Sequence, residues 1–294
     1  MLFNSFIFIG LLLVTFILYY LPIFNRLQIP VLIISSLIFY SYKQPILVLL
    51  LLLSVSINII SSYFVVYGAK RYKKLFAICG VVLNLSILIF FKYSPLFAKT
   101  FFYESSSFGD FLLTIPLPIG ISFFTFQGIS LVVDVYREKY FDNRDIVPKS
   151  FFDHSKRVLF FKGFFPQLIS GPIVKAHDFM PQIKTKYFSE INWESAFKSL
   201  ITGYFLKMVV ADNLKDFTYW IVFPYFQNQS TLTLISMLFG YSCQIFADFA
   251  GYSLIAIGLA KLFGYNLMTI SIFHIFLNHL KSFGKDGIFL YHHF

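Results

Sequence analysis

Long apolar runs recur along this chain and constrain its fold more than any other feature. The first run, Phe3 to Ile23, is long enough to cross the roughly 30 Å hydrocarbon core of a bilayer. Further runs follow near Pro30–Tyr42, Ile46–Tyr67, Leu75–Phe91, Leu117–Tyr136, Ala196–Val210 and Thr233–Phe263. Charged residues make up only 13% of the chain, against roughly 25% in soluble domains, so its surface would not stay dispersed in water. The pattern predicts an all-α, polytopic transmembrane protein and excludes a soluble enzyme and a disordered chain.

The chain is organised as one membrane domain. Its first run has neither a basic leader nor a small-residue cleavage site, which favours a first transmembrane helix over a removed signal peptide. The second run, 30–42, is short for a span. No repeat or linker divides the chain, so residues 1–268 are predicted to be the N-terminal part of a single membrane domain. Cys79 and Cys243 lie inside apolar runs and indicate small core residues rather than a disulfide or a metal site.

Basic residues are unevenly distributed between the predicted loops. The chain has 24 Lys and Arg against 14 Asp and Glu, and they cluster at 70–74 and in the stretch 137–186. Cytoplasmic loops carry such an excess, so both stretches are predicted to be cytoplasmic and the N-terminus extracytoplasmic. The loop 93–116, in which Lys99 is the sole basic residue, then lies outside. This explanation disfavours nucleic-acid binding, which the same charge would suggest in a soluble domain.

The segment 151–183 is semi-apolar, rich in Phe, Pro and Gly, and too broken to be a straight span. Non-helical backbone at membrane depth is tolerated only where protein or a water-filled cavity satisfies its polar groups. A re-entrant or half-buried cytoplasmic element is one interpretation. An amphipathic surface helix followed by a proline loop is the other, and the sequence does not separate them.

Asp248 is the ionisable residue placed deepest in an apolar run. A carboxylate at that depth is costly and normally faces a cavity or a partner. Tyr241, Gln244, Asp248 and Tyr252 are spaced so that they share one helix face. The stripe suits the lining of a substrate tunnel, while a hydrogen-bonded seam between helices is the plainer alternative.

Other polar residues give weaker signals. Asp134 ends a run and is interpreted as an interfacial carboxylate paired with a nearby cation. His154 and His177 are interpreted as surface groups of the basic middle segment. Glycine-rich phosphate loops and metal or nucleophile motifs are absent from the sequence, so nothing supports nucleotide or metal chemistry.

Several blocks in order resemble the membrane-bound O-acyltransferase family, in its bacterial alginate O-acetyltransferase and D-alanyl-lipoteichoic-acid branch. The blocks are Asn84-Leu85 with Phe91-Lys92-Tyr93, Leu117 to Gln127 with Asp134 to Arg137, Phe164 to Val174 with Asp178-Phe179 and Pro181-Gln182, and Asp248 to Ser253 with Ala256 to Gly264. Their order and spacing match the family over nearly all of residues 1–268.

The resemblance implies a fold, here a partial one, in which a ring of transmembrane helices surrounds a thin centre pierced by a tunnel. The substrate-tunnel candidates are Gln167, Ser170, Gly171, Pro172, Tyr241, Gln244, Asp248, Tyr252 and Ser253. In such proteins a cytoplasmic thioester, on coenzyme A or an acyl carrier protein, donates an acyl group to hydroxyls of a cell-surface polysaccharide. The resemblance also implies residence in the bacterial cytoplasmic membrane and an extracytoplasmic accessory acyltransferase as partner, with no bound cofactor.

Two family histidines serve the reaction, one in a Phe-Trp-x-Arg-Trp-His block and one in a Leu-Trp-His-Gly block. Neither block is present in these 294 residues, so no catalytic residue is assigned and the chain as given is predicted to be inactive. The alternative classes are a non-catalytic membrane scaffold and a transporter. A transporter should show paired broken helices in two related halves, which the sequence does not display.

The last 26 residues, 269–294, differ abruptly from the rest and contain four of the six histidines. The coding sequence of this tail can also be read in a shifted frame, in which each new codon consists of the last base of one codon and the first two bases of the next. With permitted synonymous codons, this frame encodes NFNIPYFSKS, one undetermined residue and then KEFWKRWHISLSSF. This contains the missing tryptophan–histidine block. The tail is therefore predicted to be an out-of-frame product of a frameshift near Met268, and its histidines are not interpreted as a metal site.

The coding DNA tests this interpretation directly. We expect a read from the Gly264 codon to several hundred bases beyond Phe294 to show the tryptophan–histidine block, and then a Leu-Trp-His-Gly block, in a shifted frame. If resequencing shows these blocks in the same frame as residues 1–268, the shift is a sequencing error. Absence of both blocks from every frame would refute the frameshift and make the tail a genuine sequence.

Overall fold

The computed structural model describes residues 3–42, 45–101, 107–116, 118, 120–137, 146–168 and 171–267, and in this part of the chain all regular structure is helical. The tail 269–294 lies outside the described residues. The longer helices are α1 (Phe6–Tyr20), α2 (Gln28–Ser41), α3 (Ile46–Tyr67), α4 (Lys73–Phe101), α6 (Ile121–Arg137), α8 (Phe151–Gly163), α11 (Trp193–Tyr204) and α13 (Thr231–Leu262). Shorter ones are α5 (Ser107–Thr114), α9 (Phe165–Leu168), α10 (Ala176–Phe179) and α12 (Asp212–Thr218). The predicted all-α class is confirmed.

Four helical segments are long and apolar enough to cross a membrane: Pro22–Ser41, Ile46–Tyr67, Lys70–Phe101 and Thr231–Leu262. The first apolar run forms a helix of 15 residues, shorter than predicted. The short run 30–42 belongs to the longer segment Pro22–Ser41. The run 196–210 belongs to a helical stretch in which α11 continues through a π-helical turn, Phe205–Ala211, into α12. These features confirm a polytopic membrane protein.

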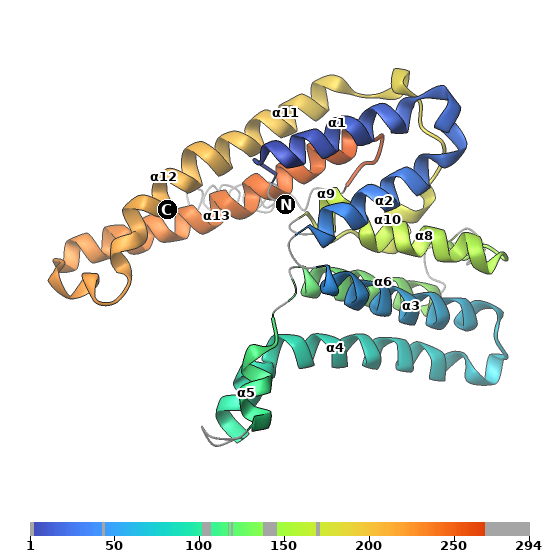
Figure 1. The fold of residues 1–294 in the computed structure, drawn as a ribbon, viewed down its shortest axis with the longest axis horizontal. Helices are drawn as coiled ribbons and strands as arrows, with labels where there is room; N and C mark the ends of the chain where they lie inside the picture. The colour runs from blue at the N-terminus through green and yellow to red at the C-terminus, as the bar shows by residue number, and fades with distance from the viewer. Residues whose placement is uncertain are drawn as a thin grey trace, which may run out of the picture.

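The helices form two groups (Figure 1). In one group α2, α3, α4, α6 and α8 lie side by side, and α3 contacts α4, α6 and α8. In the other, α11 and α12 run along α13, with α1 beside them. The hydroxyls of Tyr19 and Tyr20 on α1 donate to the carbonyls of Phe263 (3.1 Å) and Leu262 (2.7 Å) at the end of α13. Helix α1 is thereby fixed to the second group, while its contacts with α2 join it to the first.

The contact between α11 and α13 depends on small residues. A Cβ atom on Gly203 would lie 2.7 Å from the backbone nitrogen of Ile255, and one on Gly251 would lie 2.9 Å from the carbonyl oxygen of Gly203. Helices that pack in a membrane commonly use small residues in this way, because backbones can then approach closely. The glycines therefore set the spacing of this helix pair.

Helix α8 runs antiparallel to α3 and penetrates the bundle. Near the end of α3, the Tyr67 hydroxyl donates to the Val147 carbonyl at 2.7 Å. More than one turn closer to the middle of α3, the Ser62 hydroxyl lies 2.7 Å from His154 Nε2. Near the middle of α3, Ser54 accepts a hydrogen bond from Lys162, close to the end of α8. These contacts show a half-buried, re-entrant element, and a helix lying on the surface does not fit them.

Substitution at Gly203 tests the packing of α11 on α13. We expect Gly203→Ala to lower stability by about 1–3 kcal/mol, because the added methyl group has to displace the backbone of α13. The measurement is the thermal unfolding midpoint in detergent, followed by circular dichroism. Gly10→Ala on α1 is the matched control, because nothing lies within 4 Å of its added Cβ. An equal midpoint for the two variants would contradict the tight contact.

Candidate functional site

Polar side chains form a ladder along the buried face of α3. Ser54, Asn58, Ser61 and Ser62 are all less than 5% exposed, although they lie in one of the most apolar helices of the chain. Asn58 and Asn84 of α4 hydrogen-bond to each other through their side-chain amides, at 3.1 and 3.2 Å. A Cβ atom on Gly128 of α6 would overlap the Asn58 side-chain amide, so α6 packs directly against the ladder. Hydrogen-bonded polar groups of this kind hold membrane helices together where apolar side chains gain little by association.

Lys162 joins this ladder from α8. Its side chain is fully buried, and its Nζ donates to the Ser54 hydroxyl at 2.7 Å. The Ser54 hydroxyl in turn donates to Asn84 Oδ1 at 2.8 Å, and the ammonium lies 5.6 Å from the centre of the Phe124 ring. Among the described residues no carboxylate pairs with Lys162. A buried basic group held only by neutral partners is costly, and at membrane depth such groups mark functional regions.

The re-entrant element turns directly after Lys162. The backbone N–H of Phe165 donates to the Ser36 hydroxyl of α2 at 3.1 Å, which supplies a partner where the helix is interrupted. Gln167 is buried and donates from Nε2 to the Phe161 carbonyl, while its Oε1 accepts no hydrogen bond from the described residues. Gly171 and Pro172 are also buried, and a Cβ atom on Gly171 would lie 2.5 Å from Gln167 Cα. Ser170, the fourth candidate of this segment, lies outside the described residues.

The α13 stripe faces the helical stretch that contains the π-helical turn. Lys207, in that turn, contacts Asp248 Oδ1 at 2.8 Å and also pairs with Asp212. Its ammonium lies 5.3 Å from the centre of the Tyr252 ring. The Thr218 hydroxyl donates to Gln244 Oε1. These contacts form a polar seam between α13 and its neighbours.

The seam does not enclose the stripe completely. The Asp248 side chain keeps 44% of its surface exposed despite its ion pair, and Tyr241 is 47% exposed. Ser253 is intermediate in exposure. A lining role and a seam are therefore compatible, because one side of the carboxylate binds Lys207 while the other stays accessible.

The two sets of candidates are separate but share an aromatic cluster. The Phe3 ring lies 6.0 Å from that of Tyr252 and 5.8 Å from that of Phe39. The Phe39 ring is in turn 5.8 Å from Phe165 in the re-entrant element. The candidates on α13 thus connect to those near Gln167 through packed rings rather than through direct polar contacts.

Asp134 and His177 come together, although they are far apart in sequence. Asp134 Oδ2 lies 3.0 Å from His177 Nδ1 and accepts a hydrogen bond from the Ser130 hydroxyl at 3.3 Å. His177 Nε2 is 3.5 Å from Asp178. Asp134 was predicted to pair with a nearby cation, and the structure places the His177 imidazole, which is a cation only when protonated, beside it. The contact ties α6 to α10. The prediction that His154 and His177 are surface groups is wrong for His154, which is fully buried.

Sequence reasoning missed Lys162 and Lys207. Lys162 follows two phenylalanines and precedes Gly163 and Phe164, so its position within an apolar stretch was the available signal. Lys207 carries the same signal, because it lies inside the apolar run 196–210, but its partners depend on the π-helical turn, a rare geometry that often occurs at functional sites.

Comparisons with known proteins agree with the motifs. The chain is 34% identical to a peptidoglycan O-acetyltransferase of Helicobacter pylori, over 82% of this chain and 49% of that protein. It is 31% identical to a probable alginate O-acetylase of Pseudomonas aeruginosa, over 90% and 50% respectively. A teichoic acid D-alanyltransferase of Bacillus subtilis is 28% identical over 50% of this chain and 35% of that relative. The chain matches no protein-family model.

These relatives, together with the polytopic helical fold, define a class of integral membrane proteins that modify cell-surface polymers. The chain belongs to the membrane-bound O-acyltransferase family. The chain spans about half the length of the Helicobacter and Pseudomonas relatives.

A double-mutant cycle tests the Lys162 contact. We expect Ser54→Ala to lower stability by about 1–3 kcal/mol, because it removes the hydrogen-bond acceptor of the buried Lys162 amino group. In a Lys162→Met background Ser54→Ala should cost less, since the methionine leaves no buried amino group to satisfy and only the bond from Ser54 to Asn84 is then lost. Thermal unfolding midpoints in detergent for both single variants and the double variant measure the coupling. Additive effects would show that the two side chains do not interact.

Proposed function

We propose that the protein is a membrane-bound O-acyltransferase that transfers a short acyl group, in the simplest case acetyl, to hydroxyls of a bacterial cell-surface polysaccharide. The observation that carries this proposal is the similarity, over 82% and 90% of the chain, to two proteins named for O-acetyl transfer to cell-envelope polymers. The related D-alanyltransferase supports acyl transfer as the common reaction, with the acyl group differing between relatives.

The proposed orientation follows from the charge distribution. The Lys70–Tyr72 turn, the end of α6 at Arg137 and the start of α8 all belong to one end of the first helix group, since Lys73 lies over Tyr136 and Tyr63 donates to the Lys149 carbonyl. This basic end is assigned to the cytoplasm of a bacterial inner membrane, with the N-terminus extracytoplasmic. The donor, a thioester of coenzyme A or of an acyl carrier protein, approaches from that side. An accessory acyltransferase acts with the protein on the extracytoplasmic side.

The proposed tunnel passes between the re-entrant element and α13. The exposed part of the Asp248 carboxylate and the buried Gln167 Oε1, which has no partner among the described residues, are its polar contacts. A buried acceptor without a partner is uncommon and is satisfied by an ordered water or a substrate donor. In the reaction a base takes the acceptor hydroxyl proton as its oxygen attacks the thioester carbonyl, and the thiolate leaves. The base is assigned to the family histidines, so the residues of this chain position substrates rather than move the proton.

Replacement of Asp248 tests the lining role. In the coding sequence extended through the shifted frame, we expect Asp248→Asn to lower acyl transfer at least tenfold, because the carboxylate that contacts the passing substrate loses its charge. The measurement is the ester-linked acetate released by mild base from the cell-surface polysaccharide of a host without endogenous O-acetylation. The 294 residues alone should transfer none.

Asp212→Asn is the matched control, because Asp212 pairs with the same Lys207 but lies outside the α13 stripe. Retained acyl transfer in this control, with equal amounts of folded protein in both variants, supports a lining role for Asp248. Unchanged transfer in Asp248→Asn would refute that role. A parallel loss of transfer and thermal stability in both variants would identify Lys207 and its two carboxylates as helix-packing groups only.

A further inference from the structure

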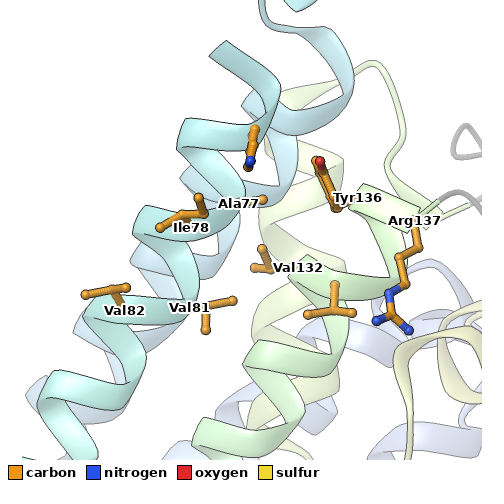
Figure 2. A pocket seen from close by; sticks show the side chains of 9 residues that line it. Ala77, Ile78, Val81, Val82, Val132, Tyr136 and Arg137 are labelled. Atoms are coloured by element: carbon orange, nitrogen blue, oxygen red, sulfur yellow. The ribbon is translucent and has the colours of Figure 1, made fainter.

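A groove runs along the outside of the first helix group, between α4 and α6. It encloses about 330 Å³. Its walls are aliphatic: Ala77, Val81, Val132 and Val133 form the inner part, and Ile78 and Val82 the outer rim. Figure 2 shows Val81 of α4 and Val132 of α6 facing each other across the groove. Ile78 and Val82 are about half exposed, so the groove opens sideways, toward the surroundings of the helix group.

The polar residues of the groove all lie at one end. Lys74 of α4 lines that end, together with Tyr136 and Arg137 of α6, which follow Val132 and Val133 by one turn. Figure 2 shows Tyr136 and Arg137 at the end of α6, beyond Val132. Neither cation forms an ion pair with a described carboxylate, and none of the described residues that line the groove is acidic. The lining therefore combines an aliphatic trough with a positively charged mouth.

We propose that this groove binds an anionic phospholipid. One acyl chain lies in the trough against the valines of α4 and α6, and the phosphate group lies between Lys74 and Arg137. The lining from Lys74 to Val82 spans two helical turns and more, about 12 Å at 1.5 Å per residue. This matches most of the roughly 15 Å hydrocarbon thickness of one leaflet, half of the bilayer core.

Geometry and charge together favour a lipid over a soluble anion. The aliphatic walls open sideways between two helices, one of which is a candidate membrane span, so hydrocarbon meets the groove directly. Basic residues beside membrane helices attract anionic lipid headgroups, each contributing about fivefold to binding. A soluble phosphate would use the mouth and leave the trough without a role.

Lipid binding by the purified 294-residue chain tests the proposal. Mass spectrometry of the detergent-solubilised protein can compare retained phosphatidylglycerol with phosphatidylcholine of identical acyl chains. We expect preferential retention of phosphatidylglycerol, and we expect Lys74→Gln with Arg137→Gln to reduce that preference roughly 25-fold. The matched control is Lys70→Gln with Arg71→Gln, which removes the same charge from exposed neighbours that do not line the groove.

The trough is tested separately by Val133→Phe, which fills the groove from a partly exposed position and leaves both cations in place. We expect it to reduce retention of phosphatidylglycerol severalfold. An equal loss of phosphatidylglycerol preference in the Lys74/Arg137 variant and in the Lys70/Arg71 control would indicate diffuse electrostatic attraction and would refute the site. Equal retention of phosphatidylglycerol and phosphatidylcholine by the unaltered chain would also refute it. Inorganic phosphate that displaces phosphatidylglycerol completely would show that the mouth alone binds, and would also refute the proposal.

Discussion

The polar face of α3 is the feature on which the re-entrant element depends. In hydrocarbon there is no water to satisfy an interrupted helix, so non-helical backbone survives only against protein groups that can hydrogen-bond to it. Ser54 and Ser62 meet Lys162 and His154 of α8, and Ser36 of α2 meets the backbone at Phe165, where the helix is interrupted. The asparagines of α3 and α4 then hold the ladder in place. Loss of this face would leave His154 and Lys162 of α8 without their hydrogen bonds to α3 at the depth to which α8 penetrates.

Much of the fold could be predicted from the sequence because membrane spans are local features. The boundaries of α3 match the apolar run 46–67, and the blocks around Asp248 and Pro166 indicated the correct family. The depth of α8 could not be predicted, because it depends on contacts between residues about 90 to 110 positions apart, such as Ser62 with His154 and Ser54 with Lys162. Likewise, the spacing of Tyr241 to Tyr252 correctly predicted a shared helix face. The contact of Asp248 on this face with Lys207 could not be predicted, because it depends on a π-helical turn that has no sequence signature here.

A helix seam and a tunnel wall are not exclusive functions for the same residues. Gly203 and Gly251 bring α11 and α13 so close that the π-helical turn and Asp248 must meet. Lys207 then holds two carboxylates, which fixes Asp248 in position without covering it. A group that is anchored on one side and accessible on the other is suited to orient a passing substrate, because its geometry is fixed before the substrate arrives. Packing thus supplies the preorganisation that a lining residue needs.

Helix α6 connects the membrane surface with the re-entrant element. Val133 and Arg137 line the groove, while Asp134, which accepts a hydrogen bond from Ser130, contacts His177 of α10. Two neighbouring faces of one helix therefore contact two different environments: a groove open at its side and the polypeptide that returns from membrane depth. Because Gly80 of α4 and Gly128 of α6 allow close approach to α3, α6 cannot shift without disturbing the polar ladder. Whatever occupies the groove thus contacts a helix whose position is fixed by the same ladder that supports Lys162.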